Sequence, residues 1–199
     1  VEHNGEFWQF PTATSCPKPL QPEVPVWVAA RSPITYDYAL REKCHVMCWP
    51  LTRGFDEAKL YKKHLDDAVE KADNGFRPTF AMMRHAAVYH KQDDRDEAIR
   101  AIQTILGQFE NLFRNMDDVH NGFPQKIPLD ELQGREQYQP DMLEENLLFG
   151  SPDTVIEKLK RYEALGVDEF IYYASMGMGM DVQKRSMNLF CSEVIPAFQ

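Results

Sequence analysis

Residues 25–49, PVWVAARSPITYDYALREKCHVMCW, predict a strand, a helix and a second strand in direct succession. Residues 26–30 are a short continuous apolar run, typical of a strand covered on both faces in a parallel sheet. Ser32 and Pro33 are favoured at the cap and at the first position of a helix, so a helix should begin at about Ser32. Residues 46–49 form the next apolar run. The stretch therefore predicts a βαβ unit, in which ligands collect at the carboxyl edge of the sheet.

Several polar groups should converge at the start of this helix. They are the Arg31 guanidinium, the Ser32 and Thr35 hydroxyls and the first free N–H groups of the helix. This combination suits a phosphate monoester, because the groups donate hydrogen bonds and the helix end carries a partial positive charge. Many Ser-Pro helix starts have no ligand. The residues alone leave two interpretations open: a site for a phosphate-bearing cofactor, or an ordinary helix start.

The rest of the chain continues the alternation of helices and strands. The apolar periodicity predicts an α/β fold with about four parallel strands and one domain over residues 1–199. Helices are expected over residues 55–73, 93–116, 151–166 and 181–196, and further strands over residues 76–89 and 167–174.

Particular residues should define these helices. Ser151 and Asp181 are expected as N-caps, and Gly166 as a helix stop. The residues expected on buried helix faces are Leu60, Tyr61, His64, Leu65, Ala68, Ala72, Ala98, Ile102, Ile105, Phe109, Leu112, Phe113, Val155, Leu159 and Tyr162.

Two segments lack a clear period. Residues 1–25 are rich in proline and are expected to form a connector, with GEFWQF as one arm of a hairpin. Residues 117–146 contain several glycines and prolines and are expected to be an insertion loop, either a functional lid or a surface excursion.

Composition narrows the function classes. With 199 residues and 43% hydrophobic residues, the chain can bury a core, and a single domain is expected. The net charge of -9 and the absence of a basic stripe argue against a nucleic-acid partner. There is no apolar run of membrane-spanning length and no signal peptide at the amino end, so we expect no membrane association and a cytoplasmic location.

The four cysteines, Cys16, Cys44, Cys48 and Cys191, show neither a C-x-x-C pair nor the density of a disulfide framework. We expect them to be free thiols that behave as small buried apolar residues. The six histidines lack the spacing of a metal site, so no metal is expected.

Five segments, taken in order, resemble the luciferase-like flavin-dependent monooxygenases, the family of bacterial luciferase. They are HNGEFWQFP (residues 3–11), PKPLQPEVP (17–25), PVWVAARSPITYDYAL (25–40), FGSPDTVIEKLKRYEALGVDEFIYY (149–173) and SMNLFCSEVIPAF (186–198).

The resemblance implies a (β/α)8 barrel, a fold that commonly takes about 250 residues. This chain would supply its carboxyl-terminal half, the fifth to eighth strands, and the first four strands would precede Val1. The histidine that some members use as an acid or base lies in the first half of the barrel. No catalytic residue is therefore assigned here.

The resemblance also implies a cofactor and a reaction. The family uses reduced flavin mononucleotide (FMN), which a separate reductase can supply, together with dioxygen to oxidise a small or long-chain organic substrate. The residues that match the cofactor-binding positions are Ala30, Arg31, Ser32 and Thr35 around the phosphate and Trp49 near the flavin ring. A tryptophan at a strand end is also common in a core.

Two alternatives stay open. Relatives with the same fold use the deazaflavin F420 for hydride transfer without oxygen. A truncated, non-catalytic chain could instead act as a flavin-binding or subunit module. In either case, an incomplete barrel with open sheet edges should form a homo- or hetero-oligomer.

Overall fold

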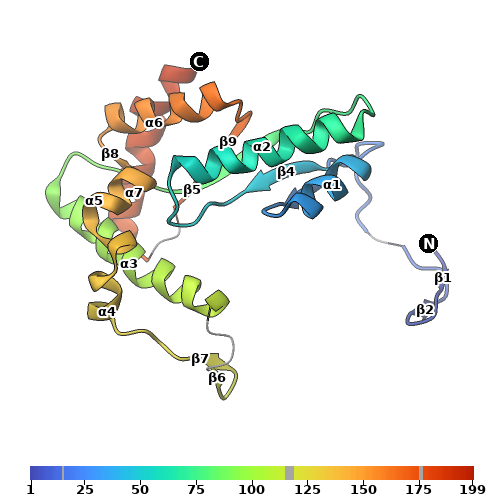
Figure 1. Cartoon of the computed structure of the whole chain (residues 1–199), viewed down its shortest axis with the longest axis horizontal. Coiled ribbons are helices and arrows are strands. Elements are labelled where there is room, and N and C mark those ends of the chain that lie inside the picture. Colours follow the sequence, from blue (N-terminus) through green and yellow to red (C-terminus); the bar gives the residue numbers. More distant parts are fainter. Residues whose placement is uncertain (15, 115–118, 175–176) are drawn as a thin grey trace.

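A parallel sheet forms the centre of the computed structural model, which describes residues 1–14, 16–114, 119–174 and 177–199. The strand order is β3 (Trp27–Ala29), β4 (His45–Cys48), β5 (Phe80–Val88) and β9 (Glu169–Tyr173), all parallel. A short further strand, β8 (Leu148–Gly150), pairs with the last three residues of β5. The strand–helix alternation visible in Figure 1 is that of a partial (β/α) barrel.

Helices α1 (Pro33–Arg41), α2 (Phe55–Ala72) and α6 (Pro152–Leu165) cover one face of this sheet. Alternate residues of β4 and β5, such as Val46 and Met82, pack against α1 and α2. Successive strand side chains point to opposite faces, so the residues between them face away from these helices. We call that side the inner face; it carries Trp27, Ala29, His45, Met47, Ala81, Met83, His85, Glu169, Ile171 and Tyr173.

The remaining elements are mostly helical and follow β5 or β9 along the chain. Helix α3 and the segment after it form a second core with the end of β5, which includes Ala87, Ile102 and Leu132. The elements are α3 (Gln92–Arg114), β6 (Val119–His120), β7 (Phe123–Pro124), α4 (Leu129–Gly134), η1 (Glu136–Tyr138), α5 (Pro140–Asn146), α7 (Met180–Leu189), η2 (Phe190–Val194) and η3 (Ile195–Phe198).

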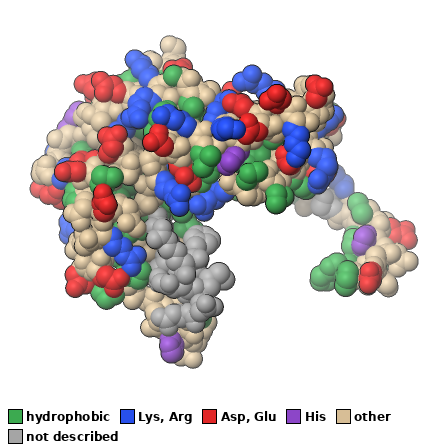
Figure 2. Space-filling model, in the orientation of Figure 1, with side chains coloured by type: hydrophobic (Ala, Val, Ile, Leu, Met, Phe, Trp, Pro, Cys, Tyr) green, Lys and Arg blue, Asp and Glu red, His purple; other side chains and the backbone are tan. Residues whose placement is uncertain are grey.

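The expected hairpin near the amino end is present as β1 (His3–Asn4) and β2 (Gln9–Phe10). It lies apart from the sheet at the end of an extended connector (Figure 1). Phe7 and Trp8 are 84% and 76% exposed, and hydrophobic side chains gather on this arm in Figure 2. The same view shows acidic and basic side chains intermingled over the rest of this surface.

The prediction that residues 26–30 are covered on both faces is wrong. Val26 is 55% exposed and Ala29 is exposed, whereas Ala30 is buried. The reason is the place of β3 in the sheet, because it is the outermost strand and has a described strand, β4, on one side only. An apolar run indicates that a strand could be buried on both faces. Whether it is buried depends on the other elements that pack against it.

Four further expectations need correction. Leu60 and Ile105 are 42% and 43% exposed, since they lie at the edge of the buried helix faces rather than within them. Asp181 is not a cap: α7 begins one residue earlier, with Gly179 at the N-cap, and Asp181 lies in its first turn. Of the cysteines, Cys44 and Cys48 are buried but Cys16 and Cys191 are exposed; all four are free. Side chains beyond residue 109 of α3, Leu112 and Phe113 among them, lie outside the described residues.

The predicted insertion contains short regular elements instead of one irregular loop. Helix α5 is tied to α3 by Arg95, whose Nε and Nη2 donate to the two carboxylate oxygens of Glu144, at 2.7 Å each. The Tyr89 hydroxyl, just after β5, donates to the same carboxylate. Lys158 of α6 donates to the Leu147 and Phe149 carbonyls at 3.1 and 3.0 Å. These polar contacts fix the insertion near the carboxyl end of β5.

Candidate cofactor site

The turn that follows β3 is held in place by a buried network. Ala30 is 1% exposed, and its N–H donates to the Met47 carbonyl at 2.9 Å. The Cys48 thiol donates to the Ala30 carbonyl at 3.2 Å and lies 2.9 Å from the Tyr36 hydroxyl. Burial raises the pKa of the Cys48 thiol to about 12, so it stays protonated and available as a donor. Ala30 therefore fixes the backbone of the turn, and its side chain belongs to the core.

The hydroxyls of Ser32 and Thr35 lie together at the first turn of α1. Their oxygens are 3.1 Å apart, and Ser32 has the extended backbone of an N-cap. The Thr35 and Tyr36 amides donate to the Ser32 carbonyl, at 2.9 and 3.4 Å, and Pro33 has no N–H. The Ser32 side chain makes no capping hydrogen bond. One hydroxyl proton of the pair is thus left for another acceptor.

A second Ser-Pro-x-Thr sequence provides an internal comparison. Ser151 follows β8 and begins α6, and its Oγ lies 3.1 Å from Thr154 Oγ1, as in the Ser32–Thr35 pair. Ser151 Oγ also accepts the Thr154 N–H at 3.3 Å, which is an ordinary helix cap. The prediction of α6 with Ser151 as cap and Gly166 as a left-handed stop (φ 89°) is confirmed. The sequence pattern is the same, but only Ser151 uses its hydroxyl for the helix.

Arg31 lies beside this pair. It is exposed, and its Nε donates to the Tyr61 hydroxyl of α2 at 3.2 Å. Within the described ranges its two terminal amino groups have no hydrogen-bond partner and no carboxylate within ion-pair distance. The structure thus places the Ser32 and Thr35 hydroxyls together at the carboxyl edge of the sheet, and holds the neighbouring Arg31 guanidinium against Tyr61 of α2.

Trp49 lies one strand away from this turn, on the inner face just after β4. Its ring packs against His85 (centroids 5.4 Å apart), Tyr173 (5.6 Å) and Phe109 (5.1 Å). Trp49 is half-buried, and its indole N–H is buried without a partner among the described residues. It therefore belongs to an aromatic group at the ends of three strands, β4, β5 and β9, rather than to the phosphate turn.

His85 was missed by reasoning from sequence. It is 1% exposed, and neither ring nitrogen has a hydrogen-bond partner in the described part of the chain. Burial and the neighbouring Arg84 lower the pKa of His85 to about 3, so the imidazole is neutral. A usable signal existed: His85 stands at an even spacing from Ala81 and Met83, which places all three on one strand face.

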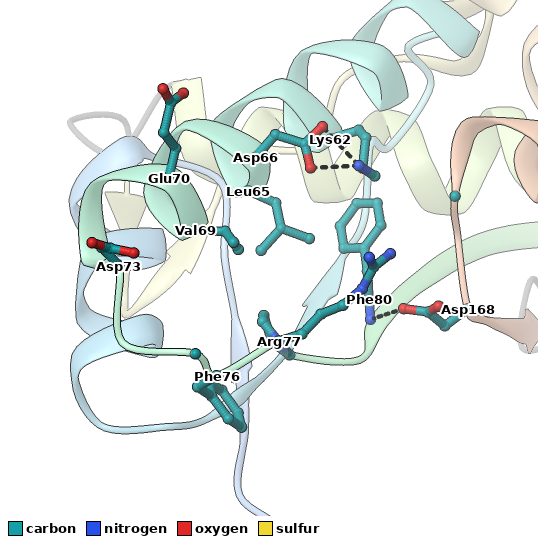
Figure 3. A pocket seen from close by; sticks show the side chains of 13 residues that line it. Lys62, Leu65, Asp66, Val69, Glu70, Asp73, Phe76, Arg77, Phe80 and Asp168 are labelled. Atoms are coloured by element: carbon teal, nitrogen blue, oxygen red, sulfur yellow. Dashed lines mark hydrogen bonds and ion pairs between the residues drawn. The ribbon is translucent and has the colours of Figure 1, made fainter.

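Figure 3 shows a pocket of about 410 Å³ at the opposite end of the sheet. Its walls include Leu65 and Val69 of α2, and residues that precede β5 and β9, such as Arg77 and Asp168. Asp168 accepts the Phe80 N–H at 2.8 Å. This pocket lies at the amino ends of β5 and β9, whereas Ser32 follows the carboxyl end of β3, so the two places are separate. The amino ends of barrel strands generally serve stability.

The described residues contain no candidate metal site and no candidate membrane span. No group of three His, Cys, Asp or Glu side chains there is arranged to hold a metal ion. None of the helices in the same ranges has the length and apolar character that a membrane span requires.

Comparison with known proteins agrees with the fold. The family model described as luciferase-like monooxygenase matches residues 1–169. A curated relative, the oxygenase component of flavin-dependent trigonelline monooxygenase from Acinetobacter baylyi, is 35% identical over 198 residues, which is 99% of this chain and 55% of the relative. This chain spans about half the length of that protein.

Two solved structures share the architecture. An F420-dependent secondary alcohol dehydrogenase, bound to an F420-acetone adduct, matches with a TM-score of 0.64 at 19% identity, over 100% of this chain and 56% of that one. The oxygenating constituent of 3,6-diketocamphane monooxygenase from Pseudomonas putida, in complex with FMN, matches with a TM-score of 0.61 at 16% identity, over 99% and 58%.

The chain belongs to the luciferase-like monooxygenase family. Its parallel sheet and helices form about half of the barrel of its structural neighbours, as expected from the resemblance.

Proposed function

We propose that this chain is the carboxyl-terminal half of the oxygenase component of a flavin-dependent monooxygenase. Arg31, Ser32 and Thr35 bind the phosphate of reduced FMN, and the inner face near Trp49 lies against the flavin ring. When bound, reduced flavin supplies the electrons that activate dioxygen. A separate flavin reductase supplies the reduced flavin, because the relative's name describes an oxygenase component and so implies a second component.

One observation carries the proposal: the Ser32 hydroxyl is not used to cap its helix, although the matching Ser151 hydroxyl is. A phosphate at Ser32 would accept the free hydroxyl proton and would lie at the positive end of α1. The Arg31 guanidinium, tethered through Nε to Tyr61, would supply two more donors. The residues therefore fit the phosphate of the cofactor.

The chain's own residues would hold and shield the flavin rather than transfer protons. Ala30 and Cys48 fix the turn from behind, and the aromatic side chains at the ends of β4, β5 and β9 exclude water from the inner face. Trigonelline, the substrate named for the curated relative, is the first compound to assay as a substrate of this chain.

The test is oxygen incorporation by the native polypeptide that carries this chain, with FMN, NADH and an added flavin reductase. With labelled dioxygen and trigonelline, mass spectrometry should find one labelled oxygen atom in the product. The same assay without substrate is the control for free oxidation of reduced flavin. If no preparation with any organic substrate incorporates oxygen, the monooxygenase proposal fails.

A second candidate function is F420-dependent hydride transfer, which the shared fold of the alcohol dehydrogenase favours. The absorbance spectrum of the cofactor that copurifies with the native protein separates a flavin from a deazaflavin. Reduced F420 should not replace reduced FMN if the first proposal is right. A chain that binds cofactor but has neither activity would be the non-catalytic module.

A further inference from the structure

We propose that a pocket of about 430 Å³ at the amino end of β9 binds a small organic cation with a compact apolar body, such as a quaternary ammonium. We call it the β9 pocket; it is lined by α6, by residues 167–170 at the start of β9 and by residues of η2 and η3. The strands are parallel, so this end of the sheet is opposite to the turn at Ser32. The β9 pocket is therefore separate from the proposed cofactor site, and the inference goes beyond the proposed function.

The first step is the composition of the walls. Aromatic side chains from α6, from β9 and from the carboxyl-terminal segment line the same space: Tyr162, Phe170, Phe190 and Phe198. The Phe170 and Phe190 rings are neighbours, with centroids 6.3 Å apart. Aromatic rings attract a cation near their faces, most strongly when the cation has lost its water. Walls of this kind suit an organic cation, which is weakly hydrated, better than a hydrated inorganic ion.

The second step is the charge of the walls. The charged side chains that line the β9 pocket are Glu163, Asp168 and Glu169, and no lysine, arginine or histidine of the described residues joins them. Asp168 uses one carboxylate oxygen to accept the Phe80 N–H at 2.8 Å. The Glu163 and Glu169 carboxylates have no hydrogen-bond or ion-pair partner in the described ranges. A cleft lined by a single sign of charge concentrates ligands of the opposite sign. The β9 pocket should therefore favour a cation and repel an anion.

The third step separates an organic cation from a metal ion. The three carboxylates do not converge, because no three acidic, histidine or cysteine side chains of the described residues are placed to hold a metal ion. The volume of about 430 Å³ lies in the range of small-molecule sites, about 300 to 1,000 Å³. Leu159 of α6 and Val194 of η2 belong to one buried core, so the two sides of the pocket are packed against each other. The β9 pocket is thus a fixed space of the size of a small organic molecule.

Ligand-observed NMR titration of the native polypeptide with choline tests the β9 pocket. The comparison ligand is 3,3-dimethylbutan-1-ol, which has the same shape but carries a carbon atom in place of the charged nitrogen. The parent protein should bind choline at least about tenfold more tightly than the alcohol, because the rings and the carboxylates act on the charge. The double variant Glu163→Gln, Glu169→Gln should reduce that preference at least about threefold. Both residues are exposed, so we expect the variant to fold.

Two further variants complete the test. Phe198→Leu keeps an apolar side chain but removes a ring that is 39% exposed, so it should weaken choline binding about threefold and leave the binding of the alcohol unchanged. Glu157→Gln is the matched control, because Glu157 is an exposed carboxylate of α6 that does not line the pocket, and it should leave both affinities unchanged. The proposal is overturned if choline does not bind, if choline and the alcohol bind equally, or if the pocket variants bind choline as tightly as the parent. Failure of oxygen incorporation, by contrast, concerns the proposed function alone.

Discussion

The His85 ring stacks on the Tyr173 ring across β5 and β9, with their centroids 4.4 Å apart. The two residues are direct partners in the parallel register, which runs from Ala81 opposite Glu169 to His85 opposite Tyr173. At this register β9 ends at Tyr173, while β5 continues to Val88. The register gathers side chains from distant parts of the sequence near the carboxyl edge, where α/β sheets bind their ligands.

The buried neutral state of His85 predicts a pH dependence of stability. The pKa of His85 is lowered to about 3 in the folded chain, from an ordinary value of 6.5. As the pH falls through this window, the unfolded chain gains a proton that the folded chain does not, so folding loses stability by up to about 1.4 kcal/mol per pH unit.

His85→Phe should flatten that slope, as measured by urea unfolding at several values between pH 7 and pH 5. The Glu144 carboxylate does not contribute to the slope between pH 7 and pH 5, because its hydrogen bonds with Arg95 lower its pKa from 4.5. Equal slopes for the parent and the variant would show that folded His85 accepts a proton.

The apolar face of α6 predicts a large effect of one truncation. Leu159 is 7% exposed and packs in the core between α6 and the end of β5. Leu159→Ala should lower the free energy of unfolding by about 2 to 5 kcal/mol, through lost burial and the cavity left behind. The control is Lys160→Ala, which changes the next, exposed residue. A melting curve of Leu159→Ala that superimposes on the parent curve would place Leu159 outside the core.

The Arg95–Glu144 pair predicts measurable coupling between α3 and the insertion. Its bidentate geometry and partial burial should give a coupling energy of about 1 kcal/mol in a double-mutant cycle with Arg95→Met and Glu144→Gln. The exposed Lys63–Asp67 pair on α2 is the control and should couple by less than about 0.5 kcal/mol. Equal coupling in both cycles would mean that the insertion is not anchored through this pair.

The open edge of the sheet predicts the behaviour of the isolated 199-residue chain. Val26 is 55% exposed, and the outer edge of β3 pairs with no described strand. Open edges and exposed apolar residues favour association. The isolated chain should therefore self-associate and bind flavin poorly. Sedimentation and near-UV dichroism at low concentration provide the measurement. A compact monomer with a sharp aromatic signal and tight flavin binding would refute this account of the half barrel.

Local signals in the sequence were enough to predict most elements. The Ser151 cap, the Gly166 stop and the apolar stripe of α6 act within a few residues of one another, and all are observed. The expected strand over residues 76–89 is observed as β5, shortened at both ends to Phe80–Val88. The ends of a strand depend on where its neighbouring strands end, and the local sequence does not indicate which strands are neighbours.

Reasoning from sequence worked less well at the site. Ser32 and Thr35 are three residues apart at a helix start, so the contact between their hydroxyls could be predicted from the sequence alone. His85 meets Trp49 and Tyr173 only through the strand order and register, which bring together residues up to 124 positions apart (173 − 49). The difference between Ser32 and Ser151 was also invisible, because both have the same Ser-Pro-x-Thr pattern and only the local backbone decides which hydroxyl caps its helix.

The most direct test of the phosphate site compares FMN with riboflavin, which lacks the phosphate, in titrations of the native polypeptide. The parent protein should bind FMN at least about tenfold more tightly, because charge-assisted hydrogen bonds to the phosphate contribute about 1.5 to 3 kcal/mol. In Ser32→Ala and Thr35→Ala that preference should fall towards one, while Ser151→Ala should keep it and lose only stability. Equal affinities of the parent for FMN and riboflavin, or an FMN preference that survives both substitutions, would contradict the phosphate site at Ser32 and Thr35.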